Sequence, residues 1–247
     1  MAFIHSFERD GNWLFKHRGP IPAVLFVLAI PAIYFTDYDL HCSAFSFVLN
    51  VMAVGSVITG FFIRAYTIGT TPLGTSGRNT AQQVAEELNS TGIYSTVRHP
   101  LYLGNYLMWI GLVVYTENIP FVIIVSLLFW IYYERIMFAE ERFLERKFGD
   151  AYLHWSLSVP AFIPKVSQFK KSNVPFSLKS VLRREYSGVL ATVVGFAYIE
   201  LMIHVFQYHE WKISHSSLCI LAGSIVLTII LRSLKHYTSL LDEAGRS

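Results

Sequence analysis

The sequence has few charged residues and few cysteines, and each shortage excludes a class of protein. Only 15% of the 247 residues are charged, against about 25% in ordinary soluble domains. In contrast, 53% of the residues are hydrophobic and the mean hydropathy is +0.42, which predicts a membrane protein. Cys42 and Cys219 lie far apart, so they indicate neither a disulfide framework nor a thiolate metal site, and we expect no bound metal.

Three familiar sequence patterns are also missing. The first twenty residues lack the charged start, short apolar core and small-residue cleavage site of a signal peptide, so insertion is expected to depend on the first apolar run. No internal repeat stands out, which disfavours a transporter, although a non-enzymatic membrane scaffold stays open. The basic residues follow a membrane boundary without a recognisable binding module, so we expect no nucleic-acid partner.

Six apolar runs are each close to the length that crosses a membrane, which is about 20 residues for roughly 30 Å of hydrocarbon. They predict an all-α fold, a polytopic integral membrane bundle of six transmembrane helices. The first run is the weakest, because it is short and contains Pro22 and Pro31, which free backbone carbonyls. The runs cover residues 21–35, 44–63, 101–115, 119–133, 189–206 and 218–231.

The distribution of lysine and arginine predicts the orientation of these helices. Six spans bring both termini to one side, and nineteen of the twenty basic residues fall on that side, Lys212 being the exception. The positive-inside rule therefore places both termini and both long connections in the cytosol. The outer turns, near residues 37–42, 116–118 and 209–215, are too short to build a site, so we expect the active site to face the cytosol.

The stretch GIYSTVRHPLYLGNYLMWIG places two cationic side chains directly before an apolar helix. Pro100 suits the first turn of that helix, so Arg98 and His99 are expected just outside it, beside its unpaired backbone N–H groups. Two cations and a helix N-terminus together predict an anion site. Gly104 leaves room for the close approach of a ligand or of a neighbouring helix.

The fourth apolar run continues into the sequence YYERIMFAEERFLERKFGDAY, in which glutamates accumulate as the helix leaves the membrane. The third and fourth spans form a hairpin with a tight outer turn, so their cytosolic ends must be close. Glu140 and Glu141 are therefore expected to face Arg98 and His99 across one pocket. An arginine at a membrane boundary and a Glu-rich helix end are each commonly structural, so the prediction depends on their pairing through the hairpin.

These residues resemble the RHPxYxG...EE pattern of membrane-embedded methyltransferases, a superfamily that includes isoprenylcysteine carboxyl methyltransferases and phospholipid N-methyltransferases. The resemblance covers about residues 92–155 and implies S-adenosylmethionine as the cofactor, with a lipid or lipid-linked substrate that enters from the bilayer. No Gly-rich strand-to-helix fingerprint is found, which disfavours a soluble Rossmann-type methyltransferase. The residues that carry the resemblance are Arg98, His99, Pro100, Tyr102, Gly104, Glu140, Glu141, Phe148, Gly149 and Tyr152.

The resemblance assigns roles to single residues. His99 and the exposed N–H groups would take the carboxylate of S-adenosylmethionine, and Glu140 or Glu141 its ammonium group or ribose hydroxyls. Its sulfonium would lie against the faces of Tyr102 or Tyr106, which share one side of the helix. The cofactor-binding set is completed by Pro100 and Gly104, and the catalytic pair would be Arg98 and Glu141.

The identity of the methyl acceptor stays open, with an anionic oxygen on a lipid as the favoured choice. A carboxylate or phosphate oxygen is already deprotonated at neutral pH, and Arg98 with Arg183 or Arg184 would bind and orient it. A phospholipid amine would instead need a base, either a glutamate or His99. The basic residues 165–184 serve either to set topology and attract anionic lipid or to grip an acidic headgroup.

A related branch, the membrane sterol reductases, carries a similar RHPNYxGE stretch but transfers hydride from NADPH. Leu101 and Asn105 replace the Asn and Glu of that branch, which favours methyl transfer. We therefore divide the chain into residues 1–70 with the first two spans, residues 71–165 as the S-adenosylmethionine-binding core, and residues 166–247 with a basic connection and a final helix pair.

The final helix pair is an addition to the family pattern, which usually ends near the C-terminus. Within it, Glu200 and His204 lie four residues apart on one helix face, and ionisable groups inside a membrane are costly unless paired or hydrated. They are expected to form a buried structural pair, with an interfacial position or a catalytic role as the alternatives. The sequence leaves the role of this helix pair and the oligomeric state open.

Overall fold

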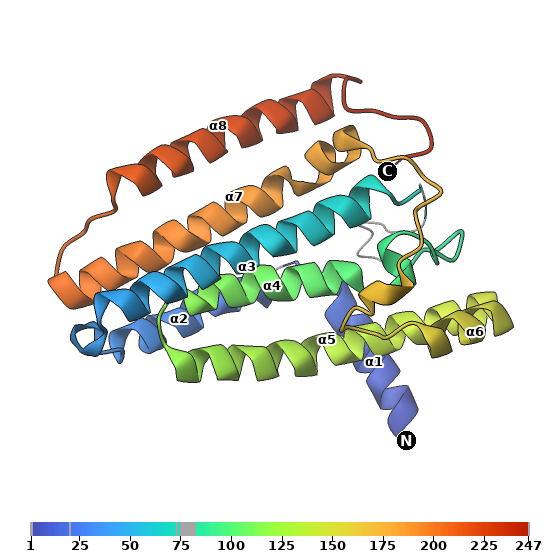
Figure 1. Cartoon of the computed structure of the whole chain (residues 1–247), viewed down its shortest axis with the longest axis horizontal. Helices are drawn as coiled ribbons and strands as arrows, with labels where there is room; N and C mark the ends of the chain where they lie inside the picture. The colour runs from blue at the N-terminus through green and yellow to red at the C-terminus, as the bar shows by residue number, and fades with distance from the viewer. Residues whose placement is uncertain (1, 20, 73, 75–82, 247) are drawn as a thin grey trace.

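The computed structural model describes residues 2–19, 21–72, 74 and 83–246, and these residues are predominantly helical (Figure 1). One isolated bridge joins Gly92 to Lys170. The α-helices are α1 (Phe3–Lys16), α2 (Val24–Tyr34), α3 (Ser43–Gly69), α4 (Pro100–Val114), α5 (Ile119–Phe148), α6 (Asp150–Ser158), α7 (Leu178–Ile203) and α8 (His215–Tyr237). The short elements are η1 (Ile21–Ala23), η2 (Tyr38–Leu40), η3 (Ile93–Ser95), η4 (Val166–Gln168) and the π-helical turn η5 (His204–Tyr208). The long helices run side by side in the order α8, α7, α3, α4 and α5.

Four of these helices, α3, α5, α7 and α8, are long and apolar enough to cross a membrane, so the chain is a multi-pass membrane protein. The segments α1 and η1–α2 are bent sharply against each other and add at most a fifth crossing. The predicted count of six is therefore not confirmed, because α2 has only 11 residues and α4 only 15, short of the about 20 that span the hydrocarbon. The orientation of the termini stays a prediction, and Arg78, which contributed to it, lies outside the described residues.

Helices α3 and α4 approach closely because glycines face each other across their contact. A Cβ added to Gly60 would lie 2.7 Å from the carbonyl oxygen of Gly104, and one added to Gly104 would lie 2.9 Å from that of Gly60. Two turns further along α4, a Cβ on Gly111 would lie 2.6 Å from the carbonyl oxygen of Ala53. Small residues allow such backbone contact in membrane helices. This packing holds the end of α3 beside the start of α4.

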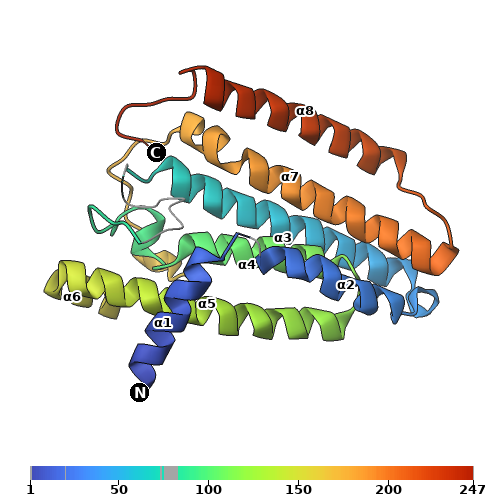
Figure 2. The ribbon, with the colours of Figure 1, turned by 180° about the vertical axis from the view of Figure 1, so that it is seen from behind.

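The N-terminal helix α1 packs across the extension of α5 that runs beyond its apolar part (Figure 2). Gly11 permits this crossing, since a Cβ there would lie 2.1 Å from the carbonyl oxygen of Arg135. Glu8 also forms an ion pair with Arg146 at 2.6 Å. Phe15 is buried as a result, and the guanidinium of Arg18 lies 3.7 Å above its ring. Helix α1 and the residues that follow it thereby bring Phe15 and Arg18 to the end of the bundle where α4 begins.

Glu200 and His204 do not form the side-chain pair that we predicted. The carboxylate of Glu200 accepts the backbone N–H of Ser214 at 2.9 Å, at the N-cap of α8. The ring of His204 donates instead to the backbone carbonyl of Glu200, at 3.0 Å. An acceptor at a helix N-terminus satisfies a donor that has no partner within the helix. Glu200 therefore fixes the turn between α7 and α8, at the other end of α7 from Arg184.

The glycine contact between α3 and α4 is open to a direct test. We expect Gly60→Val to destabilise the protein by about 1–3 kcal/mol, the usual cost of overpacking, because the new side chain meets backbone. Gly55→Val is the matched control on the same helix, since a Cβ there has no neighbour within 4 Å. Thermal unfolding in detergent measures the difference. Equal stability of the two variants would contradict the packing described.

Candidate active site

The backbone of Arg98 and His99 is held by the segment that follows α6. The N–H of Arg98 donates to the carbonyl oxygen of Pro160 at 2.9 Å, and the N–H of His99 to that of Ala161 at 3.1 Å. Pro100 then begins α4 as predicted, with His99 as the N-cap residue. The two cationic residues are thus fixed by contacts far away in the sequence, and their side chains project toward α5.

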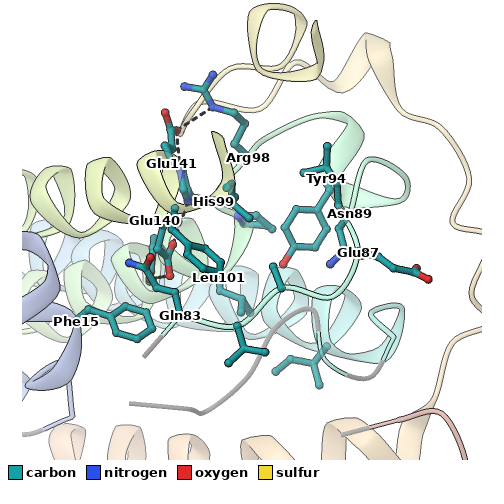
Figure 3. Close-up of a pocket in the computed structure, with 18 of the residues that line it drawn as sticks. Phe15, Gln83, Glu87, Asn89, Tyr94, Arg98, His99, Leu101, Glu140 and Glu141 are labelled. Carbon is teal, nitrogen blue, oxygen red and sulfur yellow. Dashed lines mark hydrogen bonds and ion pairs between the residues drawn. The ribbon is translucent and has the colours of Figure 1, made fainter. Parts of the chain in front are cut away.

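The start of α4 and the extension of α5 converge as predicted (Figure 3). His99 Nε2 lies 2.8 Å from Glu141 Oε1, and Arg98 Nε lies 3.0 Å from the same oxygen. Glu140 accepts a hydrogen bond from the Tyr102 hydroxyl at 2.7 Å. His99 Nδ1 lies 3.6 Å from Glu140 Oε2, which is a charge contact rather than a hydrogen bond. The predicted meeting of the two segments is confirmed, while the roles of these residues stay predictions.

The environment of His99 favours its charged form. Burial alone would lower the pKa of the His99 imidazole, but the carboxylates of Glu140 and Glu141 outweigh burial and raise this pKa above its ordinary value. Only 7% of His99 is exposed, so solvent screens the interaction weakly. The geometry and the direction of this pKa shift both indicate that His99 interacts strongly with Glu141.

A cavity of about 250 Å³ lies beside this cluster, enclosed by residues of α1, α3, α4, α5, α6 and α7. Figure 3 shows Arg98, His99 and the two glutamates on one side of it, with Tyr94 and Asn89 opposite. Most of the predicted site residues line this cavity. They are Arg98, His99, Pro100, Tyr102, Glu140, Glu141 and Arg184.

Three predicted site residues lie outside the cavity lining. Gly104 is packed against Gly60 and Arg64 of α3, so the close approach that it permits is to a helix. Tyr106 exchanges a 3.1 Å hydrogen bond with Ser126 and packs in an aromatic cluster within the bundle. Arg183 forms an ion pair with Asp242 near the C-terminus. Their positions give no support to direct contact with a ligand in the cavity.

The sequence analysis missed a buried ion pair in the cavity wall. Arg64 of α3 donates from Nε and Nη2 to the two carboxylate oxygens of Glu185 on α7, at 2.8 and 2.7 Å. Asn105 of α4 lies beside Arg64 and donates to the hydroxyl of Tyr133 at 3.1 Å. In the sequence, Arg64 is one of the nineteen basic residues that predict the membrane orientation, and nothing next to it indicates a partner. A single charge inside an otherwise apolar helix was the available signal, because such a charge needs a partner.

Two buried polar atoms at the cavity have no hydrogen-bond partner among the described residues. One is the hydroxyl of Tyr152 on α6, and the other is Nε of Arg98, whose contact with Glu141 lacks hydrogen-bond geometry. Buried polar atoms are usually satisfied, so such atoms at a cavity suit a polar ligand. Within the same described residues, no group of three or more His, Cys, Asp or Glu is arranged to hold a metal ion.

Part of the chain is similar to known proteins. The phospholipid methyltransferase family model matches residues 44–151. The protein-S-isoprenylcysteine O-methyltransferase of Schizosaccharomyces pombe is 27% identical over 141 residues, which is 51% of this chain and 58% of the relative. The nickel-cobalt-cadmium resistance protein NccN of Alcaligenes xylosoxydans xylosoxydans is 36% identical over 87 residues, 35% of this chain and 40% of the relative. The cobalt-zinc-cadmium resistance protein CzcN of Cupriavidus metallidurans is 34% identical over 83 residues, 34% of this chain and 38% of the relative.

The class is that of a multi-pass membrane protein with a cavity, lined by charged side chains, at one end of an apolar helical hairpin. Residues 44–151 of the chain are similar to the membrane methyltransferase superfamily that includes phospholipid and isoprenylcysteine methyltransferases, in agreement with the resemblance found in the sequence. These matches cover less than two thirds of each curated relative. No solved structure matches the chain significantly. Helices α1, α7 and α8 lie outside the matched family region.

The raised pKa of His99 predicts a pH dependence. Because its folded-state pKa exceeds the unfolded value, its pairing stabilises the protein fully below the unfolded pKa, and this contribution is lost as pH rises through the folded pKa. Nuclear magnetic resonance of ¹⁵N-histidine in detergent should show a ring that titrates above its ordinary value. Glu141→Gln should lower that midpoint, and His99→Gln should remove the signal and so assign it. An unchanged midpoint in Glu141→Gln would contradict the pairing.

The Arg64–Glu185 pair predicts a non-additive pair of substitutions. Arg64→Met leaves the buried carboxylate of Glu185 without its partner and should cost about 3–5 kcal/mol of stability. The double variant Arg64→Met/Glu185→Met should recover most of this loss, because neither charge then stays buried alone. Thermal unfolding in detergent measures both effects. A double variant as unstable as Arg64→Met would show that the pair is not the source of the cost.

Proposed function

We propose that the protein is an S-adenosylmethionine-dependent methyltransferase that acts on an anionic oxygen of a membrane lipid. The observation that carries the proposal is the contact of His99 and Arg98 with Glu141, which joins the two halves of the family pattern beside one cavity. The family match over residues 44–151 supports methyl transfer as the reaction.

The residues at the cavity fit S-adenosylmethionine by their chemistry. The cofactor is a zwitterion with a sulfonium, and the wall offers His99 and Arg98 for a carboxylate and Glu140 for an ammonium or hydroxyl group. Tyr102 and Tyr94 supply aromatic faces that accommodate a cationic sulfur. When bound, S-adenosylmethionine supplies a methyl group on a positively charged sulfur.

The two arginines in the cavity wall, Arg98 and Arg184, favour an anionic acceptor over an amine. An amine acceptor must first lose a proton to a base, for which the wall offers a glutamate or His99. An anionic oxygen needs no base. The site then has only to align this oxygen with the methyl group and to stabilise the charges of the reaction. Arg184 is buried in the cavity wall and is the residue that we propose to orient such an anion, together with Arg98.

The membrane position of the site follows from the same proposal. The cavity lies at the end of α3 and α5 where the basic connections gather, and the positive-inside rule assigns that end to the cytosol. We propose that residues 71–165 form the cofactor-binding core, with residues 1–70 and 166–247 completing the cavity. Phe15 of α1 and Arg184 of α7 are the contributions of these flanking parts.

Cofactor binding is tested by a matched pair of glutamates on α5. Glu141→Gln removes the carboxylate that holds both Arg98 and His99, and we expect affinity for S-adenosylmethionine to fall at least tenfold. Glu145→Gln is the control, because Glu145 pairs with Arg142 and lies outside the cavity lining. Binding of radiolabelled S-adenosylmethionine to purified protein measures both variants. Equal binding by both would remove the site assignment, and binding of NADPH in its place would favour a reductase.

A separate assay tests the acceptor. Vesicles of total lipid extract that contain the protein are incubated with methyl-labelled S-adenosylmethionine, and label is followed into the organic phase. Mass spectrometry should show a 14 Da increase on an acidic lipid, as expected for one added methylene. A shift on an amine-bearing lipid would retain the methyltransferase and replace the acceptor class.

A further inference from the structure

A second cavity of about 310 Å³ lies between α3, α7 and α8, and we call it the apolar groove. Its lining includes Ile58, Phe61 and Ala65 of α3, Leu182 and Val189 of α7, and Leu227 of α8. The exposed surface of this lining is entirely apolar, and Glu185 and Tyr186 contribute only carbon atoms to it. The groove is thus a hydrocarbon surface, and the carboxylate of Glu185 lies behind it, bound to Arg64.

All three helices that form the groove are long and apolar enough to cross a membrane. Figure 1 shows α8 running along α7, with α3 on the other side of α7. Helix α8 buries little of its apolar stretch within the protein, and Leu227 remains 46% exposed. The groove therefore lies where the surrounding solvent is lipid hydrocarbon, and an occupant there must be apolar.

Glu185 connects the apolar groove to the candidate active site, because it lines both cavities. Its carboxylate is held by Arg64, which also lines the active-site cavity. A lipid chain in the groove would therefore bring its headgroup to the wall of the active site.

A lysine lies near the end of the groove where Glu185 adjoins the active-site cavity. Nζ of Lys235, in the last turn of α8, lies 5.6 Å from the ring centroid of Tyr186, a lining residue of the groove. Basic side chains at this position attract anionic lipid headgroups. The groove therefore combines an apolar channel with a basic end, the pattern that suits an anionic glycerolipid.

We propose that the apolar groove binds one acyl chain of an anionic glycerophospholipid and delivers its headgroup to the active-site cavity past Arg64 and Glu185. The proposal rests on the function proposed above and specifies its acceptor. Helices α7 and α8 lie outside the region matched by the family, so this part of the chain supplies the acceptor specificity.

The test is photo-crosslinking of the full chain in phosphatidylcholine vesicles. The probe is phosphatidic acid with a diazirine near the end of one acyl chain, and mass spectrometry maps the crosslinked peptides. We expect crosslinks on residues around Val189 and Leu227, which lie farther from Glu185 along the groove, and excess unlabelled phosphatidic acid should suppress them at least fivefold. Ala65→Phe, which fills the groove from α3, should reduce them by a similar factor.

Ala191→Phe is the matched control, because Ala191 is exposed on α7 and lies outside the groove lining. Leu227→Trp, which fills the groove from the half-exposed face of α8, is the second blocking variant in case Ala65→Phe fails to fold. Crosslinks that are equal in the blocking variants and the control, or that unlabelled lipid does not suppress, would overturn the proposal. Suppression by a farnesylated peptide but not by phosphatidic acid would overturn it in favour of a prenyl occupant.

Binding of S-adenosylmethionine, measured on the same preparations, keeps the two proposals apart. Blocking variants that lose the crosslinks but retain cofactor affinity within twofold support both the groove and the function. Specific crosslinks in a wild-type protein that binds no S-adenosylmethionine would reject the proposed function and leave the lipid site. Cofactor binding without specific crosslinks would reject the groove alone.

Discussion

The contact between His99 and Glu141 is the interaction on which the candidate site depends, because it joins the beginning of α4 to the extension of α5. This contact is available only because α5 continues well beyond its apolar part, so that its carboxylates reach the level where α4 starts. Backbone hydrogen bonds to Pro160 and Ala161 hold His99 and its neighbour from the opposite side. The cavity is the space that remains beside this junction, and its charges are therefore buried mostly in pairs.

Helix α7 contributes residues to both the active-site cavity and the apolar groove. Arg184 lies in the wall of the polar cavity, and its neighbour Glu185 separates that cavity from the apolar groove. A buried ion pair is weak support for stability, because desolvation cancels much of its attraction. The Arg64–Glu185 pair lies between the active-site cavity and the apolar groove. Our proposals give this pair the role of controlling what passes from the groove to the cavity.

Where expectation and structure differ, local sequence was compatible with more than one long-range arrangement. Glu200 and His204 share a helix face, but the N-terminus of α8 offers Glu200 a backbone donor, and this donor outcompetes the histidine. Gly104 is compatible with the close approach of either a ligand or a helix, and in the structure it packs against Gly60 of α3. The count of six spans is not confirmed, because α2 with 11 residues and α4 with 15 are shorter than a membrane-crossing helix.

The sequence by itself determined the helical class, the apolar spans and the meeting of residues 98–99 with residues 140–141, because a tight turn between two consecutive helices leaves their ends little freedom. Only the tertiary structure decided which distant elements complete the cavity. Phe15, Arg64 and Glu185 come from α1, α3 and α7, and no local periodicity distinguishes them from residues that face lipid or water. Their convergence follows from helix packing, which depends on side-chain shape across elements far apart in the chain.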